Sequence, residues 1–347
     1  MRLDVFRPQS QLVTRTTLVD RPRFDVVDAH NHLAHPFGGG WDRKPLDQLL
    51  RLLDAARVTE YVDLDGGWGE DILRRHLDLF KARAPDRFRI FGGVDWGQWP
   101  HRGSGFADWA AGRLAAQKQA GAQGLKIWKS FGLHVQDEQD HLVRVDDPRL
   151  DPIWSAAAEN GLPVLIHVAD PVAFFEPADE RNERWEEIAA HPDWAFTSPP
   201  FPAFIDILNG LRALVRRHPS TIFIGAHVGC YAENLPWVGK MLDDCPNYFI
   251  DIAARLGELG RQPYAARKFL VRYQDRILFG SDMGPDVGSY RLSYRLLETD
   301  DEYFSYSVED TPPQGRWRVY GLHLPGDVLR KIYSANARRV LSPKEVK

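Results

Sequence analysis

The sequence is poor in cysteine, in long apolar runs and in excess charge of one sign. Only two of its 347 residues are cysteines, Cys230 and Cys245, so no disulfide framework is indicated and a reducing compartment is expected. No apolar run is long enough to span a bilayer, and the segment 1–20 does not resemble a signal peptide. We therefore expect a cytoplasmic protein that does not act at a membrane.

The charge balance argues against a polyanionic partner. Lysine and arginine total 44 and aspartate and glutamate 48, which gives a formal net charge of −4 without a basic stripe. Proteins that bind nucleic acid usually carry a clustered basic surface, so nucleic acid is not an expected partner. With 44% hydrophobic and 27% charged residues, the composition is typical of a globular protein with a sizeable core.

Short runs of β-forming residues alternate with amphipathic stretches along most of the chain. The runs expected to form strands are 26–30, 59–65, 88–95, 123–128, 163–168, 221–227, 248–252 and 277–282. The stretches expected to form helices are 45–56, 71–84, 106–120, 152–160, 205–218, 235–245 and 264–273. This alternation is typical of βαβ units and predicts an α/β fold with a parallel sheet.

Eight strands spread over about 250 residues predict a (β/α)₈ TIM barrel. A doubly wound sheet usually has a glycine-rich turn after its first strand, whereas this first strand ends in histidines. We expect an N-terminal arm at 1–23 and one barrel domain at 24–347, which includes a C-terminal helix at 325–341.

Two connections are longer than a plain barrel needs. Residues 169–204 follow the fifth predicted strand, and the aromatic-rich residues 283–325 follow the eighth. Both leave the face where barrel active sites form, so they either wall the site or serve packing and contacts between copies. The second alternative leaves a homodimer open.

Two histidines end the first predicted strand. His30 and His32 are two residues apart, so on a strand their side chains point to the same side and suit one metal ion. Two nearby histidines also occur at ordinary polar strand ends, and the other strands decide between these interpretations. Their ends carry ionisable side chains that a barrel brings to one mouth, namely Asp65, Asp95, Lys126, His167, His227, Asp251 and Asp282.

Such a buried polar cluster is costly unless its members are paired or bind a metal. Three imidazoles and a carboxylate suit Zn²⁺ best, with Mn²⁺ or Fe²⁺ as alternatives. Asp65 and Asp95 either orient histidine rings or form salt bridges within the barrel. Four tryptophans that follow strands either line an apolar pocket or pack at the barrel rim, namely Trp68, Trp96, Trp99 and Trp128.

An ordered set of motifs resembles the amidohydrolase superfamily. The motifs are Asp28-Ala-His-Asn-His32, Gly-Leu-Lys126, Leu-Ile-His167, Ile-Gly-Ala-His227 and Leu-Phe-Gly-Ser-Asp282. Within the superfamily, the chain is similar to the amidohydrolase-related (amidohydrolase 2) group of metal-dependent hydrolases and decarboxylases. The resemblance extends from residue 24 to about residue 341.

The resemblance implies a ligand set. His30, His32 and His167 would bind the metal, and Asp282 would be both a ligand and the general base. His227 would either bind a second metal or form a hydrogen bond to the attacking water or the substrate oxygen.

Two basic residues have open roles. Lys126 is either carboxylated, so that it bridges two metal ions, or holds a substrate anion, and we favour a single ion. Arg255 is a second candidate for binding a substrate carboxylate, which a guanidinium can do in a bidentate way.

The leading functional hypothesis is a metal-dependent hydrolase of a small-molecule amide, ester or lactone, with Asp282 accepting a proton from metal-activated water. The alternative is a metal-dependent non-oxidative decarboxylase or hydratase of a small carboxylic acid. A third hypothesis is a barrel whose metal is only structural, but such a site would be closed by four protein ligands.

Overall fold

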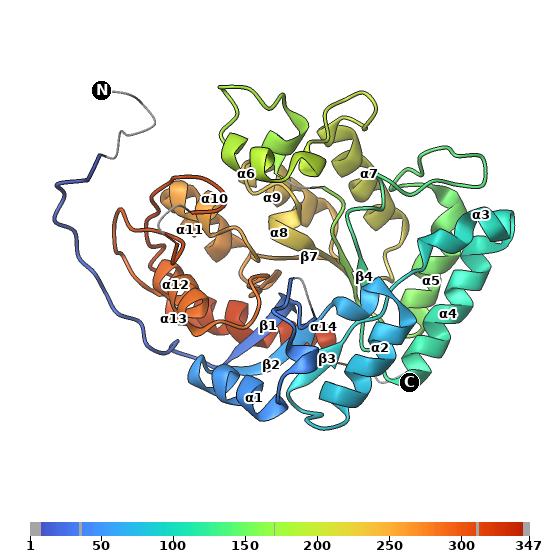
Figure 1. Cartoon of the computed structure of the whole chain (residues 1–347), viewed down its shortest axis with the longest axis horizontal. Coiled ribbons are helices and arrows are strands. Elements are labelled where there is room, and N and C mark those ends of the chain that lie inside the picture. Colours follow the sequence, from blue (N-terminus) through green and yellow to red (C-terminus); the bar gives the residue numbers. More distant parts are fainter. Residues whose placement is uncertain (1–7, 35–36, 170, 310–311, 343–347) are drawn as a thin grey trace.

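Parallel strands surrounded by helices form the body of the protein (Figure 1). The computed structural model describes residues 8–34, 37–169, 171–309 and 312–342. Its strands are β1 Val26–Asn31, β2 Val58–Asp63, β3 Phe88–Ile90, β4 Leu125–Ile127, β5 Val164–Ile166, β6 Phe223–Gly225, β7 Tyr248–Asp251 and β8 Ile277–Leu278. The predicted α/β class and parallel pairing are therefore confirmed.

Helices occupy most of the connections between strands. They are α1 Leu46–Ala55, α2 Glu70–His76, α3 Trp99–Arg102, α4 Phe106–Ala120, α5 Asp151–Glu159, α6 Trp185–Ala190, α7 Phe204–Arg217, α8 Ala226–Gly229, α9 Leu235–Asp244, α10 Leu256–Arg261, α11 Pro263–Arg272, α12 Val287–Glu298, α13 Gly326–Arg330 and α14 Asn336–Leu341. No helix in the described ranges is long and apolar enough to cross a membrane.

The strands form two sheets in chain order, β1–β2–β3 and β4–β5–β6–β7–β8. Backbone hydrogen bonds join the sheets at both seams. Between β3 and β4, the amide of Lys126 donates to the carbonyl of Gly92 (2.8 Å), and two further bonds lie beside it. Between β8 and β1, the amides of Ala29 and Asp282 donate to the carbonyls of Phe279 and His30 (2.9 Å each). The strand order is therefore that of a (β/α)₈ barrel, although the ladder is interrupted at the two seams within the described residues.

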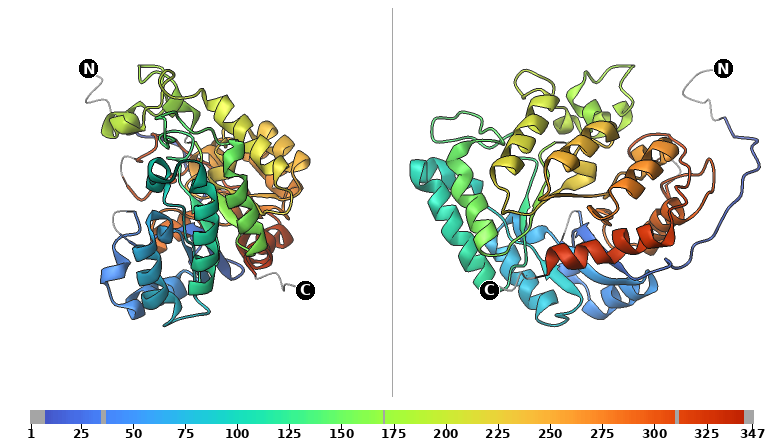
Figure 2. Two further views of the ribbon diagram at one scale, coloured as in Figure 1. Left: turned by 90° about the vertical axis from the view of Figure 1, so that its right-hand side faces the viewer. Right: turned by 180° about the vertical axis from the view of Figure 1, so that it is seen from behind.

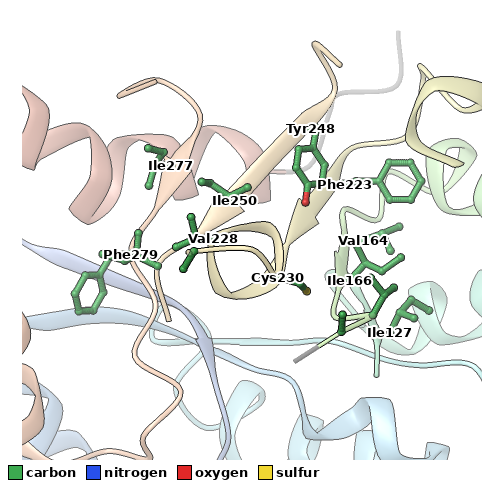
Figure 3. Packing of buried hydrophobic residues seen from close by; sticks show 14 of the residues in the cluster. Ile127, Val164, Ile166, Phe223, Val228, Cys230, Tyr248, Ile250, Ile277 and Phe279 are labelled. Carbon is green, nitrogen blue, oxygen red and sulfur yellow. The ribbon is translucent and has the colours of Figure 1, made fainter. Parts of the chain in front are cut away.

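Two apolar layers hold the barrel together. Side chains on one face of the strands pack against the helices, as Ile166 and Phe223 do (Figure 3). Their neighbours Leu165 and Ile224 face the barrel interior, as the two-residue period of a strand requires. The C-terminal helix α14 adds Val340 to this inner layer and lies across the back of the barrel (Figure 2).

The predicted arm contains no helix or strand in its described residues, 8–23. It is attached at Thr17, whose backbone amide and hydroxyl both donate to the Asp301 carboxylate at 2.6 Å. Residues 1–7 and 343–347 of the predicted arm and domain lie outside the described residues.

Several strands are shorter than the sequence predicts. The run 277–282 forms a strand only at Ile277–Leu278, and the run 221–227 only at Phe223–Gly225. In both segments the strand pairing ends early, because the residues that follow adopt other backbone conformations. These conformations place polar side chains at the barrel mouth. The helix predicted at 325–341 is confirmed, with a π-helical turn at Lys331–Ala335 between α13 and α14.

Candidate metal centre

Three potential ligands meet at the carboxyl ends of β1 and β8. The Nε2 atoms of His32 and His30 lie 3.2 and 3.8 Å from Oδ1 of Asp282. Ligands about 2.1 Å from a tetrahedral zinc ion are roughly 3.4 Å apart, so this spacing fits one bound ion. His30, His32 and Asp282 could therefore hold a divalent metal.

Carboxylates behind the two histidines fix their ring orientation. Nδ1 of His30 lies 2.9 Å from Oδ2 of Asp251, and Nδ1 of His32 lies 2.8 Å from Oδ1 of Asp65. Since a carboxylate accepts, each Nδ1 carries the proton that it donates, and each Nε2 faces Asp282, where it would offer its lone pair to a bound metal. Asp65 is held in turn by the two backbone amides that follow His32, at 2.8 and 2.7 Å.

His227 and Asp282 both occupy the left-handed backbone region, with φ of 57° and 50°. This conformation is uncommon for residues other than glycine and is found at functional sites where surrounding contacts enforce it. Here the amide of His227 donates to Oδ1 of Asp251 (3.0 Å), and the amide of Asp282 donates to the His30 carbonyl (2.9 Å). Consequently, Nε2 of His227 lies 3.6 Å from Oδ2 of Asp282.

The ring of His227 is neutral and has a defined tautomer. Nδ1 lies 2.9 Å from the carbonyl oxygen of Ala253, which only accepts, so Nδ1 carries the proton. Burial, together with the charge of Arg255, lowers the pKa of His227 well below its usual value. Nε2 is therefore an acceptor or a ligand, and the expected catalytic role of His227 stays a prediction.

His167 lies beside this group rather than within it. Its ring is 4.6 Å from that of His227, between centroids, and its side chain is buried. Among the described residues, the donors that lie within 4.8 Å of one another around Asp282 are His30 and His32 alone. The role of His167 as a third ligand stays a prediction.

Two basic side chains reach the same cavity. Nζ of Lys126 lies 3.4 Å from Nε2 of His30, and burial lowers the pKa of Lys126 to about 8 against the opposing charge of Asp282. The buried Arg255 donates from one guanidinium nitrogen to the carbonyl of Ala254 at 2.8 Å. No carboxylate oxygen in the described part of the chain lies within 4.0 Å of either cation.

A cavity of about 420 Å³ opens above these residues. Aromatic rings form one side: His32 stacks on Trp128 with centroids 5.1 Å apart, and Trp128 stacks on Trp68 at 3.8 Å. Of the two expectations for the tryptophans, pocket lining therefore holds for this pair, whereas Trp99 is buried in the core.

The two long connections differ in what they contribute. Residues 169–204 wall the cavity with Phe174, Arg184 and Trp194. The connection 283–325 contributes Gln314, while Tyr290 and Tyr294 are buried in packing around α12. The site-wall alternative thus applies to the first connection, and ordinary packing accounts for these two tyrosines of the second.

Sequence reasoning left two of these residues without a role. Asp251 ends a predicted strand, and this position indicates that it lies at the barrel mouth. Its contact with His30 is not predictable from that position, because the contact depends on which face of the barrel Asp251 occupies. Arg184 lies in an irregular connection and carries no pattern; it is buried and forms ion pairs with Glu187 (2.6 Å) and Glu258. Asp95 is exposed and only caps a short turn by accepting from Gly97 (3.2 Å).

The fold and this site together define a (β/α)₈ enzyme built around a divalent-metal centre. The family model described as Amidohydrolase matches residues 27–342, so the chain belongs to the amidohydrolase family. The resemblance seen in the sequence motifs is confirmed. No curated protein matches the chain.

Solved structures share the fold at low identity. The 2,6-dihydroxybenzoate decarboxylase from Rhizobium is 17% identical over 91% of this chain and 98% of its own, with a TM-score of 0.55. A dihydroxybenzoic acid decarboxylase from Polaromonas, with bound manganese and the inhibitor 2-nitroresorcinol, is 16% identical over 86% of both chains (TM-score 0.52). A probable 2-pyrone-4,6-dicarboxylic acid hydrolase from Acinetobacter baumannii is 11% identical over 92% and 99% (TM-score 0.53).

Proposed function

We propose that this chain is a metal-dependent, non-oxidative decarboxylase of a small aromatic carboxylic acid. The observation that carries the proposal is the pair of buried cations, Lys126 and Arg255, beside His30, His32 and Asp282. A buried cation that forms no close ion pair is costly, so a bound carboxylate would stabilise both. The indole faces of the cavity suit a planar ring on that carboxylate.

The residues divide the reaction between them. His30, His32 and Asp282 would hold the metal, which supplies Lewis-acid polarisation of a substrate oxygen. Arg255 would orient the carboxylate through its planar guanidinium, and Lys126 would add a second positive charge. Despite its burial, Asp282 is ionised in the resting site, because His30 and His32 hold its pKa well below the usual value. It would therefore first take up a proton from water at Oδ2 and then pass that proton to the ring carbon as the bond from this carbon to the carboxylate breaks. The electron pair of that bond stays on the carbon, and CO₂ leaves.

One ion per chain fits the donors better than two. A second buried group of potential ligands consists of His30, His227 and Asp251. Asp251 is not available to a metal, because it already accepts hydrogen bonds from His30 and from two backbone amides (3.0 Å each). Imidazole and carboxylate ligands suit Zn²⁺ and Mn²⁺. The manganese bound in the decarboxylase from Polaromonas supports Mn²⁺ as the first metal to test.

Hydrolysis is the second candidate, and the position of His227 favours it. Its Nε2 lone pair lies 3.6 Å from Asp282 Oδ2, so both groups could accept a proton from a water placed between them and a scissile carbonyl. The hydrolase from Acinetobacter baumannii supports this alternative. The decarboxylases from Rhizobium and Polaromonas, together with the two buried cations, favour decarboxylation.

A substrate screen separates the two reactions. Mn²⁺-loaded protein would be incubated with hydroxybenzoic acids on one side and with aryl esters, amides and lactones on the other. We expect release of CO₂ from an acid and, in D₂O, one deuterium in the product at the carbon that lost the carboxylate. Cleavage of an ester, amide or lactone without CO₂ release would establish the hydrolase instead.

Arg255→Gln is the matched variant for this screen, with Arg261→Gln as its control. Arg261 is a nearby arginine paired with the half-exposed Glu183 (2.7 Å) and outside the cavity lining. We expect Arg255→Gln to raise KM for the acid about tenfold or more, since a bidentate contact to a carboxylate is lost. An unchanged KM in Arg255→Gln would contradict the assigned carboxylate site.

A further inference from the structure

A second and larger cavity, of about 890 Å³, lies beside the metal cavity. The two cavities share three lining residues, Trp68, Trp128 and Ser130. The rest of its wall comes from the connections after β2 and β3 and from one face of α4. The proposed decarboxylation at Asp282 makes no use of this space.

Trp68 forms the boundary between the two cavities. One face of its indole stacks on Trp128 with centroids 3.8 Å apart, yet 51% of the Trp68 side chain is exposed. Leaving a large aromatic side chain half exposed forgoes burial of apolar area, unless a ligand covers it. Its position at the junction suits an aromatic ligand that extends from one cavity into the other.

The floor of the second cavity is formed by backbone in close contact. A Cβ atom added at Gly67 would lie 2.7 Å from Nε1 of Trp128, and one at Gly93 would lie 2.6 Å from Gly67. The side chain of Gln117 fixes Gly93 by accepting from its amide (3.1 Å) and donating to its carbonyl (3.0 Å). A side chain at either glycine would displace this floor, so the cavity has a defined shape.

The two arginines of this wall each face a carboxylate of the same wall. Arg113 donates to Glu70 at 2.7 Å, and Arg74 lies 3.7 Å from Asp71. The metal cavity differs, because there Lys126 and Arg255 have no carboxylate of the described residues within 4.0 Å. The second cavity therefore suits a neutral ligand group. The indoles of Trp68, Trp96 and Trp109 line the cavity and could stack on an aromatic ligand.

We propose that the second cavity binds a neutral aryl group of an extended aromatic acid, with Trp68 as a specificity-determining residue. The carboxylate-bearing ring lies in the metal cavity, and the second ring stacks on the indole of Trp68. This inference rests on the proposed function, since it assumes an aromatic acid at the metal centre. It narrows the substrate class to acids that carry a second ring.

Calorimetry with two matched acids tests the proposal. Mn²⁺-loaded protein would be titrated with salicylate and with salicylate that carries a phenyl group para to the carboxylate. We expect the phenyl group to lower Kd about tenfold, since the second ring is stacked and buried. Binding is measured directly, so the result does not depend on turnover.

Two variants distinguish binding of the second ring from binding of the carboxylate-bearing ring. Trp68→Ala removes the stacking surface, and Ile72→Trp fills the second cavity from its wall. Each should bring the Kd of the phenyl-substituted acid to within about twofold of the Kd of salicylate. Trp185→Ala is the control, because Trp185 has the same exposed fraction of 51% and lines neither cavity.

The outcomes distinguish this inference from the proposed function. If salicylate binds but the phenyl group brings no gain, or the gain survives both variants, the second cavity is not an aryl site and the inference fails alone. If neither acid binds the metal-loaded wild-type protein, the proposed aromatic-acid function fails and the inference with it.

Discussion

Two histidine–aspartate clusters lie next to Asp65, and only one of them is suited to chemistry. At the barrel mouth, His32 donates to Asp65 (2.8 Å) and presents Nε2 to Asp282 and the cavity. Behind it, Asp63 at the end of β2 meets Nδ1 of His76 in α2 at 2.6 Å. Both members of the inner pair are fully buried and line neither cavity.

The same pair of residue types thus has different roles, depending on whether the Nε2 atom of the histidine faces the cavity or the core. The ring of His76 is enclosed by Phe80, 5.2 Å away edge to face, and its Nε2 has no hydrogen-bond partner among the described residues. Burial and the charge of Asp65 raise the pKa of Asp63 to about 6. Although Asp63, Asp65 and His76 are close enough to hold an ion, we assign them a structural role.

The largest effect is expected when Asp282 is replaced in the cluster at the barrel mouth. Asp282→Asn should lower kcat/KM by about 10³-fold or more, since it removes both a ligand and an acid–base group. The assay is CO₂ release from the acid identified in the screen. Asp63→Asn is the matched control at the inner pair, and a loss of similar size there would erase the distinction between the clusters.

The carboxylates behind the histidines should affect metal affinity. Asp251→Asn and Asp65→Asn weaken the hydrogen bonds that orient His30 and His32, so metal affinity should fall about 10- to 100-fold. Titration with Mn²⁺ in competition with a chelator measures this change. Affinity within twofold of wild type in both variants would mean that these contacts do not orient ligands.

The inner pair should affect stability instead. His76→Phe leaves Oδ2 of the buried Asp63 without its hydrogen-bond donor, so the free energy of unfolding should fall by about 1–3 kcal/mol. Urea denaturation of the metal-free protein measures this change. Metal affinity should stay at the wild-type value, and a variant that loses its metal while remaining folded would assign this pair to the metal site.

The smallest effect concerns the pH dependence of stability without metal. Burial alone would lower the pKa of His32, but its hydrogen bonds to Asp282 and Asp65 raise it from 6.5 to about 9. The folded state thus keeps a proton that the unfolded chain releases, a contribution that is complete below pH 6.5 and lost as pH rises through about 9.

In chelator-treated protein, Tm should therefore decline between about pH 6.5 and pH 9 more steeply in wild type than in His32→Ala. Protein loaded with metal should lack this difference, because the ion replaces the proton on Nε2. Parallel decline of wild type and variant would contradict the proton shared between His32 and Asp282.

Regular features were well predicted from the sequence. Helix α4 has the predicted bounds 106–120, because its alanine-rich sequence favours a helix and Gly121 ends it in the left-handed backbone region. The convergence of His30, His32 and Asp282 followed from the rule that parallel strand ends meet at one mouth. That rule gives proximity only, and the role of His167 as a third ligand stays a prediction.

Features set by tertiary contacts were not predictable. The left-handed backbone of His227 and Asp282 depends on hydrogen bonds to Asp251 and His30, which are distant in sequence. The position of Arg184 depends on an irregular connection folding over the mouth. The boundary formed by Trp68 arises from its stacking on Trp128, which is 60 positions away in the sequence.

Calorimetric titration of chelator-treated protein with Mn²⁺ tests the central claim most directly. Wild type should bind one ion per chain, His32→Ala should bind none at the same concentrations, and His76→Phe should bind one with wild-type affinity. Failure of the wild type to bind Mn²⁺ or Zn²⁺, or loss of binding in His76→Phe as complete as in His32→Ala, would contradict a metal centre at the barrel mouth.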